Sequence, residues 1–77
     1  MVTLATAPIG QAVRLGTPDL SAVPAARARR LAELGLRRGA TVEVLARTAC
    51  GGRLVAVAEG RIALDKSVAR LLPVEAS

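Results

Sequence analysis

Apolar and polar residues alternate with a period of two along much of this chain, which is typical of half-buried strands. The segments that alternate are residues 11–15, 41–47, 54–58 and 61–64. Leu72 and Val74 fit a further short strand. Pro73 between them has no N–H for a strand ladder, so we expect this strand at an edge or at a closing position. The pattern therefore predicts about five short strands.

One segment has helical spacing instead. Over residues 25–34 the apolar or small residues recur every three and four positions, which marks one packed face. Pro24 suits a first helical turn, and Ser21 or Asp19 is a candidate for the cap. Residues 3–10 form a lead-in before the first strand, and we expect Leu4 to anchor it.

The end of this helix is the clearest local signal in the chain. Gly35 falls where the helix must stop, and glycine adopts the left-handed conformation of a helix end without a Cβ clash. With Gly35 at C′, Leu36 occupies C″ and Leu31 occupies C3, the two positions that touch in a Schellman motif. Gly39 then turns the chain into the next strand. We therefore predict a helix stop at Gly35 and a short basic loop after it.

Turn residues separate the later strands. Residues 48–52 contain two glycines, and Glu59–Gly60 are predicted to form a tight hairpin turn. Asp65 can cap a short helical turn over residues 66–70. The whole pattern predicts a mainly β fold, a small, strongly bent antiparallel barrel of about five strands with one helix after the first strand and a short helical turn before the last. Residues 1–77 are expected to form a single domain.

The composition defines the core and limits its size. Hydrophobic residues make up 52% of the 77 residues and aromatic residues 0%, so Leu, Val, Ile and Ala must build the interior. A chain of this length buries only about 60% of the surface that it exposes when unfolded. We therefore expect low stability, or support from self-association.

Eleven Lys and Arg against six Asp and Glu give a net charge of +5, which can steer a protein toward nucleic acid, acidic lipid or an acidic protein. The default interpretation is a solvated basic surface. Single-strand binders on small barrels stack bases on aromatic side chains, and this chain has none. A small basic nucleic-acid-binding barrel remains the alternative to a protein-interaction module.

Catalytic and metal-binding motifs are missing. The chain has no His and one Cys, which excludes a His-dependent triad, a Cys–His zinc site and an internal disulfide. The six carboxylates are spread along the chain, and we expect no enzyme, no cofactor and no tight metal site. A lone Cys50, an N-terminus unlike a signal peptide and the lack of an 18-residue apolar run favour a cytoplasmic protein without membrane insertion.

Two loops are candidates for a partner surface because loops on a rigid scaffold usually carry recognition. The first contains Leu36, Arg37 and Arg38. The second is a hairpin tip made of Cys50, Gly51, Gly52 and Arg53. The alternative is that Leu36 only completes the helix cap, the arginines are solvated, the glycines shape a turn and Cys50 is incidental.

The chain resembles the FeoA family, the small cytoplasmic component of bacterial ferrous-iron uptake. The residues that carry the resemblance are RLAELGLRRGATVEVL at 30–45, GRIAL at 60–64, Ala69, Leu72 and Val74, with Leu4, Gly10, Ala12 and Val13 in the lead-in and first strand.

This resemblance implies an SH3-like barrel with an added helix and a non-enzymatic role as an accessory to FeoB, a membrane permease with a cytoplasmic GTP-binding domain. Any association with transition metal ions is implied only for the family. FeoA-like domains also follow DNA-binding domains in iron-dependent repressors; a chain of 77 residues favours the free-standing protein.

Overall fold

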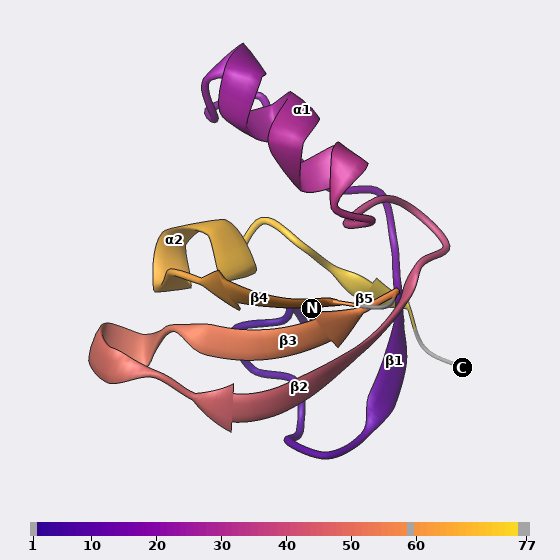
Figure 1. Ribbon diagram of the computed structural model, residues 1–77, viewed down its shortest axis with the longest axis vertical. Coiled ribbons are helices and arrows are strands. Elements are labelled where there is room, and N and C mark those ends of the chain that lie inside the picture. The colour runs from indigo at the N-terminus through magenta and orange to yellow at the C-terminus, as the bar shows by residue number, and fades with distance from the viewer. Residues whose placement is uncertain (1, 59, 76–77) are drawn as a thin grey trace.

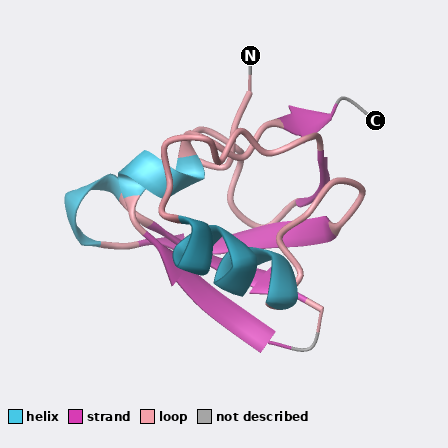
Figure 2. Ribbon diagram, turned by 90° about the horizontal axis from the view of Figure 1, so that it is seen from above, coloured by secondary structure: helices cyan, strands magenta, loops and turns pink. Residues whose placement is uncertain are grey.

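The computed structural model describes residues 2–58 and 60–75, and it is mainly β, as predicted (Figure 1). Its elements in chain order are β1 (Ala12–Leu15), α1 (Ala25–Glu33), β2 (Thr41–Arg47), the 3-10 turn η1 (Ala49–Gly51), β3 (Arg53–Val57), β4 (Gly60–Leu64), α2 (Lys66–Ala69) and β5 (Val74–Glu75). Figure 2 shows α1 lying over one side of the sheet when the molecule is seen from above.

The strands form one antiparallel sheet in the order β4-β3-β2-β1-β5. The lead-in lies along β5: the Val74 N–H donates to the Val2 carbonyl at 2.9 Å, and the Leu4 N–H donates to the Leu72 carbonyl at 3.0 Å. Pro73 pairs with Thr3 in an isolated bridge at this margin, as its missing N–H predicted. Among the described residues no pairing joins β4 to β5, so strand pairing does not close the sheet.

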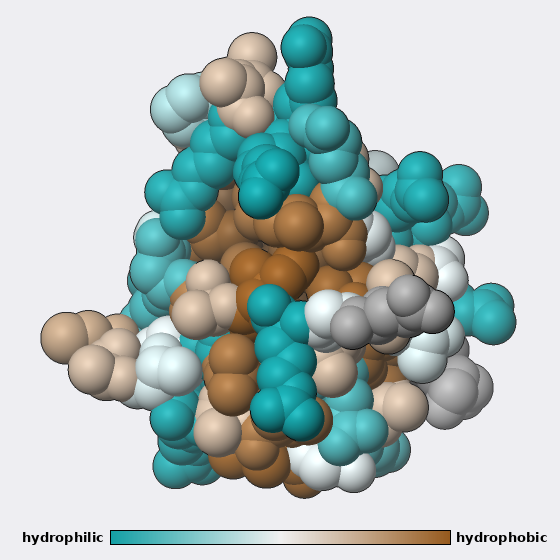
Figure 3. Space-filling model, viewed as in Figure 1, coloured by the Kyte–Doolittle hydropathy of each residue, from teal (hydrophilic) through white to brown (hydrophobic). Residues whose placement is uncertain are grey.

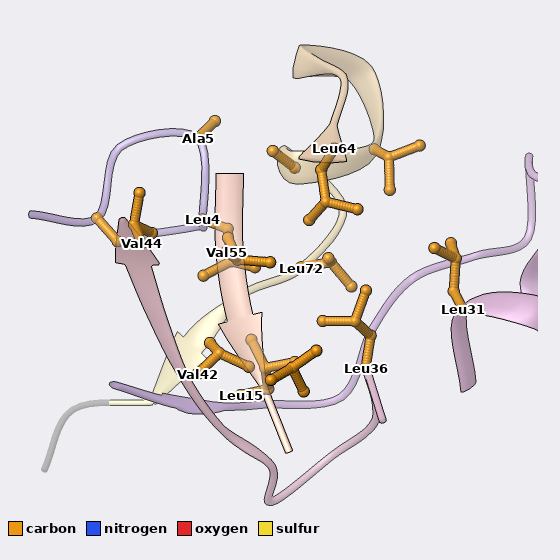
Figure 4. Close-up of a cluster of buried hydrophobic side chains, with 14 residues drawn as sticks. Leu4, Ala5, Leu15, Leu31, Leu36, Val42, Val44, Val55, Leu64 and Leu72 are labelled. Carbon is orange, nitrogen blue, oxygen red and sulfur yellow. The ribbon is translucent and has the colours of Figure 1, made fainter. Parts of the chain in front are cut away.

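The core is built from leucine, valine and alanine side chains, as the composition requires (Figure 4). The paired positions of β2 and β3 put Val42 opposite Val57 and Val44 opposite Val55, and all four are buried. Each such side chain stabilises the fold by about 1.5–3 kcal/mol relative to an exposed one. The buried hydrophobic residues are Leu4, Ala5, Ala7, Leu15, Leu31, Leu36, Val42, Val44, Val55, Val57, Leu64, Val68, Ala69 and Leu72.

The predicted helix stop is confirmed. Leu34 is the C-cap of α1, and Gly35 has φ +105°, in the region that favours glycine. The Leu36 N–H donates to the Leu31 carbonyl, and the Gly35 N–H donates to the Ala32 carbonyl, both at 3.0 Å. These are the two hydrogen bonds of a Schellman motif. Both Leu31 and Leu36 are consequently in the core.

The predicted cap at the start of α1 is wrong. Pro24 occupies the N-cap position, and no side chain caps the helix. The Asp19 carboxylate instead accepts a hydrogen bond from the Ser21 hydroxyl at 2.8 Å, and the Val23 N–H donates to the Leu20 carbonyl. Asp19 and Ser21 are thus hydrogen-bonded to each other in the turn before the helix, and neither caps α1.

The predicted turn between β3 and β4 is misplaced by one residue. Gly60 belongs to β4 and pairs with Val57, while Ala58 is a turn residue with φ 53°; Glu59 lies outside the described residues. When the turn moves by one residue, each residue of β3 pairs with a β4 residue two positions away from the predicted one. Side chains that face the core on β3 are then still opposite side chains that face the core on β4. The alternation of apolar and polar residues therefore fits the predicted and the observed register equally well.

Replacing Gly35 by valine tests the helix stop. A Cβ at Gly35 would lie 3.1 Å from the Val57 Cγ2, and a β-branched residue at positive φ is strained. We expect Gly35→Val to lower the free energy of unfolding by about 1–3 kcal/mol in a denaturant titration.

The matched control is Gly39→Val. Gly39 also has a positive φ, of +86°, but a Cβ added there would meet no atom within 4 Å. Gly39→Val should introduce backbone strain but no steric clash, so it should lower the free energy of unfolding less than Gly35→Val does. If Gly35→Val unfolded at the same denaturant concentration as the parent, Gly35 would not be required for the helix stop.

Candidate functional site

The loop between α1 and β2 presents two arginines on a fixed backbone. Arg37 and Arg38 are exposed, whereas Leu36 is only 1% exposed and belongs to the core. The Gly39 N–H donates to the Leu15 carbonyl at 2.8 Å, and the Ala40 N–H donates to the Arg37 carbonyl at 3.0 Å. Leu36 therefore anchors the loop rather than facing a partner, and the arginines remain as candidates.

These arginines border a shallow hollow of about 350 Å³. One wall comes from the α1–β2 loop and the other from Val57 and Ala58 at the end of β3, which no sequence pattern connected with the loop. Its lining residues are Gly35, Arg37, Arg38, Gly39, Ala40, Thr41, Val57 and Ala58. The close approach of Gly35 to Val57 brings the two segments together. Two exposed arginines beside an apolar wall suit an acidic segment that also carries an aliphatic side chain.

The hairpin tip has a different character. Cys50 is exposed with φ 58°, but Arg53 turns back into the chain, donating to the Gly51 carbonyl at 3.0 Å, the Gly52 carbonyl at 2.9 Å and the Ala5 carbonyl. Gly52 is buried, and a Cβ there would lie 2.8 Å from the Leu64 carbonyl oxygen. The backbone that comes close to Gly52 is thus that of Leu64 in this same chain, so the packing of the protein already accounts for a glycine at this position.

The two candidate loops do not form one site. The α1–β2 loop precedes β2 and the hairpin tip follows it, so seven strand residues separate them. Figure 1 places them at opposite ends of the sheet. Because Arg53 is engaged internally, the hollow beside Arg37 and Arg38 is the stronger candidate for recognition.

Asp65 joins the two helices. Its carboxylate accepts hydrogen bonds from the Val68 N–H at 2.9 Å, the Ser67 hydroxyl at 2.6 Å and Arg27 Nη2 at 3.0 Å. The predicted cap of α2 is therefore confirmed. The hydrogen bond from Ser67, then those from Val68 and Arg27, lower the pKa of Asp65 from 3.8 to about 2.

This lowered pKa predicts a pH dependence of stability. Between the two pKa values the unfolded state binds more protons than the folded state. The contribution of the Asp65 carboxylate to folding stability is therefore complete above pH 3.8 and is lost as the pH falls toward about 2. Asp65→Asn keeps an oxygen for the Val68 N–H but has no charge. We expect the difference in unfolding free energy between parent and variant to shrink across this window. A difference that stays constant from about pH 5 to pH 2 would contradict this.

Among the described residues, no group of three or more His, Cys, Asp or Glu side chains is arranged to hold a metal ion. Carboxylate and water ligands alone hold divalent iron weakly. We expect anaerobic calorimetry on the isolated monomer to give Fe(II) binding weaker than about micromolar. A tighter stoichiometric site that persists in monomeric protein would count against this expectation, and Cys50→Ser is the control for the single thiol.

No helix within residues 2–58 and 60–75 is both long and apolar enough to cross a membrane.

Comparison with protein families gives a match to the FeoA domain over residues 2–76. A search of curated proteins gave no match. Among solved structures, FeoA of Stenotrophomonas maltophilia is 36% identical with a TM-score of 0.78, and the match covers 97% of this chain and 91% of that one. That protein is described as complexed with zinc, as an SH3 domain protein and as a possible activating factor of ferrous iron transport.

The solution structure of FeoA from Chlorobium tepidum is 26% identical with a TM-score of 0.79, over 95% of this chain and 68% of that one. A manganese-dependent transcriptional repressor is 21% identical with a TM-score of 0.75, over 92% of this chain and 39% of that one, and this likeness shows the fold alone. The expected SH3-like architecture is confirmed by these structures.

Proposed function

Because the chain belongs to the FeoA family, we propose that it supports ferrous-iron uptake in the cytoplasm as a non-enzymatic accessory protein that binds a FeoB-type permease. The family is linked to ferrous iron transport and is not a known enzyme family. The absence of His from the sequence and the scattered carboxylates support a binding role over a catalytic one.

The single observation that carries the proposed interface is the hollow beside Arg37 and Arg38. Its backbone is fixed by the buried Leu36 and by hydrogen bonds from Gly39 and Ala40, so little ordering of the backbone is needed on binding. Arg38 makes only a 4.0 Å contact with Glu75 and its side chain is 75% exposed, so its charge is available to a partner. We assign an acidic, partly apolar segment of the permease's GTP-binding domain to this hollow.

The alternative function, nucleic-acid binding, is not favoured. The family is associated with transport, and the chain has no aromatic side chain on which a base could stack.

Charge reversal at the hollow tests the proposed interface. Arg37→Glu with Arg38→Glu should leave stability within about 0.5 kcal/mol of the parent, since both side chains are exposed. The same change should slow association with the permease's cytoplasmic domain and weaken binding, most clearly at low salt. Surface-binding kinetics over a salt series measure both effects.

The matched control is Arg29→Glu with Arg61→Glu, which changes the net charge equally at exposed positions outside the hollow. It should bind nearly as the parent does at moderate salt. Equal binding by the Arg37/Arg38 variant and the parent would remove the hollow from the interface. Equal weakening of both double variants would mean that net charge alone steers the encounter.

A further inference from the structure

Helix α1 rests on the sheet by one end. Of its nine residues only Leu31, in the last turn, is buried. Just beyond the helix, Gly35 lies against Val57, and Leu36 enters the core. Figure 1 shows the helix rising away from the sheet toward its N-terminal end. The C-terminal turn is therefore docked, whereas the N-terminal half has little packing.

The N-terminal half also lacks local stabilisation. No side chain caps the helix, and no acidic residue lies in its first turn to complement the helix dipole. Arg27 adds positive charge to this half instead, whereas Arg30 complements the dipole in the last turn. A helix of nine residues is too short to persist alone in water, so α1 depends on its tertiary contacts.

One side-chain interaction holds this half down. Arg27 Nη2 reaches Asp65 Oδ2 at 3.0 Å, and among the described hydrogen bonds and ion pairs it is the one that links an α1 side chain to another element. Asp65 is a firm anchor because it also caps α2 through the Val68 N–H. Both partners of the ion pair are about half exposed, at 51% and 52%, so the pair is weak and easily broken.

Apolar side chains lie at the docked end of the helix. Figure 3 shows hydrophobic side chains gathered between α1 and the remainder of the molecule. Leu31 is 5% and Val57 4% exposed, and both lie at the docked C-terminal end of the helix, so they stay covered when only the N-terminal half moves.

We propose that the Arg27–Asp65 ion pair is a latch that holds the N-terminal half of α1 helical and fixed to the start of α2. With the latch broken, the N-terminal half of α1 lifts and melts, because nothing local holds it helical. The inference does not depend on the proposed function, since it concerns the isolated protein and its test contains no partner.

Native-state hydrogen exchange of the α1 amides tests the latch. Arg27→Ala should speed their exchange about two- to fivefold, which is what the loss of a half-exposed ion pair allows. The amides of β2 and β3 should be unchanged. Arg29→Ala is the matched control: it makes the same change of residue type and charge in the same helix, at an exposed position without a described ion pair.

A second variant separates the latch from the cap. Asp65→Ser keeps a side-chain oxygen for the Val68 N–H but cannot pair with Arg27. It should speed α1 exchange as Arg27→Ala does, and the double variant should add nothing further. Exchange in the parent, but not in Arg27→Ala, should quicken when salt is raised to about 1 M.

Two results would overturn the proposal. One is α1 exchange in Arg27→Ala equal to that in Arg29→Ala. The other is a double variant whose acceleration is the product of those of the two single variants, because independent effects would mean that Arg27 and Asp65 do not act through one another.

Discussion

The left-handed glycine at position 35 is the constraint on which much of this structure depends. Its positive φ closes the two hydrogen bonds that end α1, and its missing side chain lets the helix end approach Val57. Because the turn is fixed, Leu31 before it and Leu36 after it both enter the core. The same turn sends the chain toward Leu15, whose carbonyl accepts from the Gly39 N–H. Helix end, core closure and loop path thus follow from one conformational requirement.

The position of the candidate site follows from the turn at Gly35, which brings the α1–β2 loop next to the end of β3. Leu36 and Gly39 fix the loop at both ends, and the two residues between them are exposed. The backbone at these two positions is therefore held in place while the arginine side chains stay exposed. The apolar wall of the hollow, Val57 and Ala58, arrives with β3 because the helix stop packs there. A rigid basic loop beside a small apolar surface suits docking better than chemistry.

The sequence predicted those features that depend on local rules. The period of two located the strands, and a glycine after a helical face located the helix stop. It did not predict the β3–β4 turn, because two registers keep the same residues inward and Ala58 accepts a positive φ. It also misassigned the helix cap, since Asp19 is engaged by Ser21. The second wall of the hollow comes from residues about twenty positions further along, which no local pattern connects with Arg37.

Net charge was the least informative property of the sequence, because arginines have three different roles here. Arg53 is turned inward and satisfies the carbonyls of its own turn and of the lead-in. Arg27 is engaged with Asp65. Arg37 and Arg38 border a hollow with an apolar wall. A net charge of +5 therefore overstates the charge available to a partner, and the interface proposed for this surface depends on the positions of two arginines rather than on the number that the chain carries.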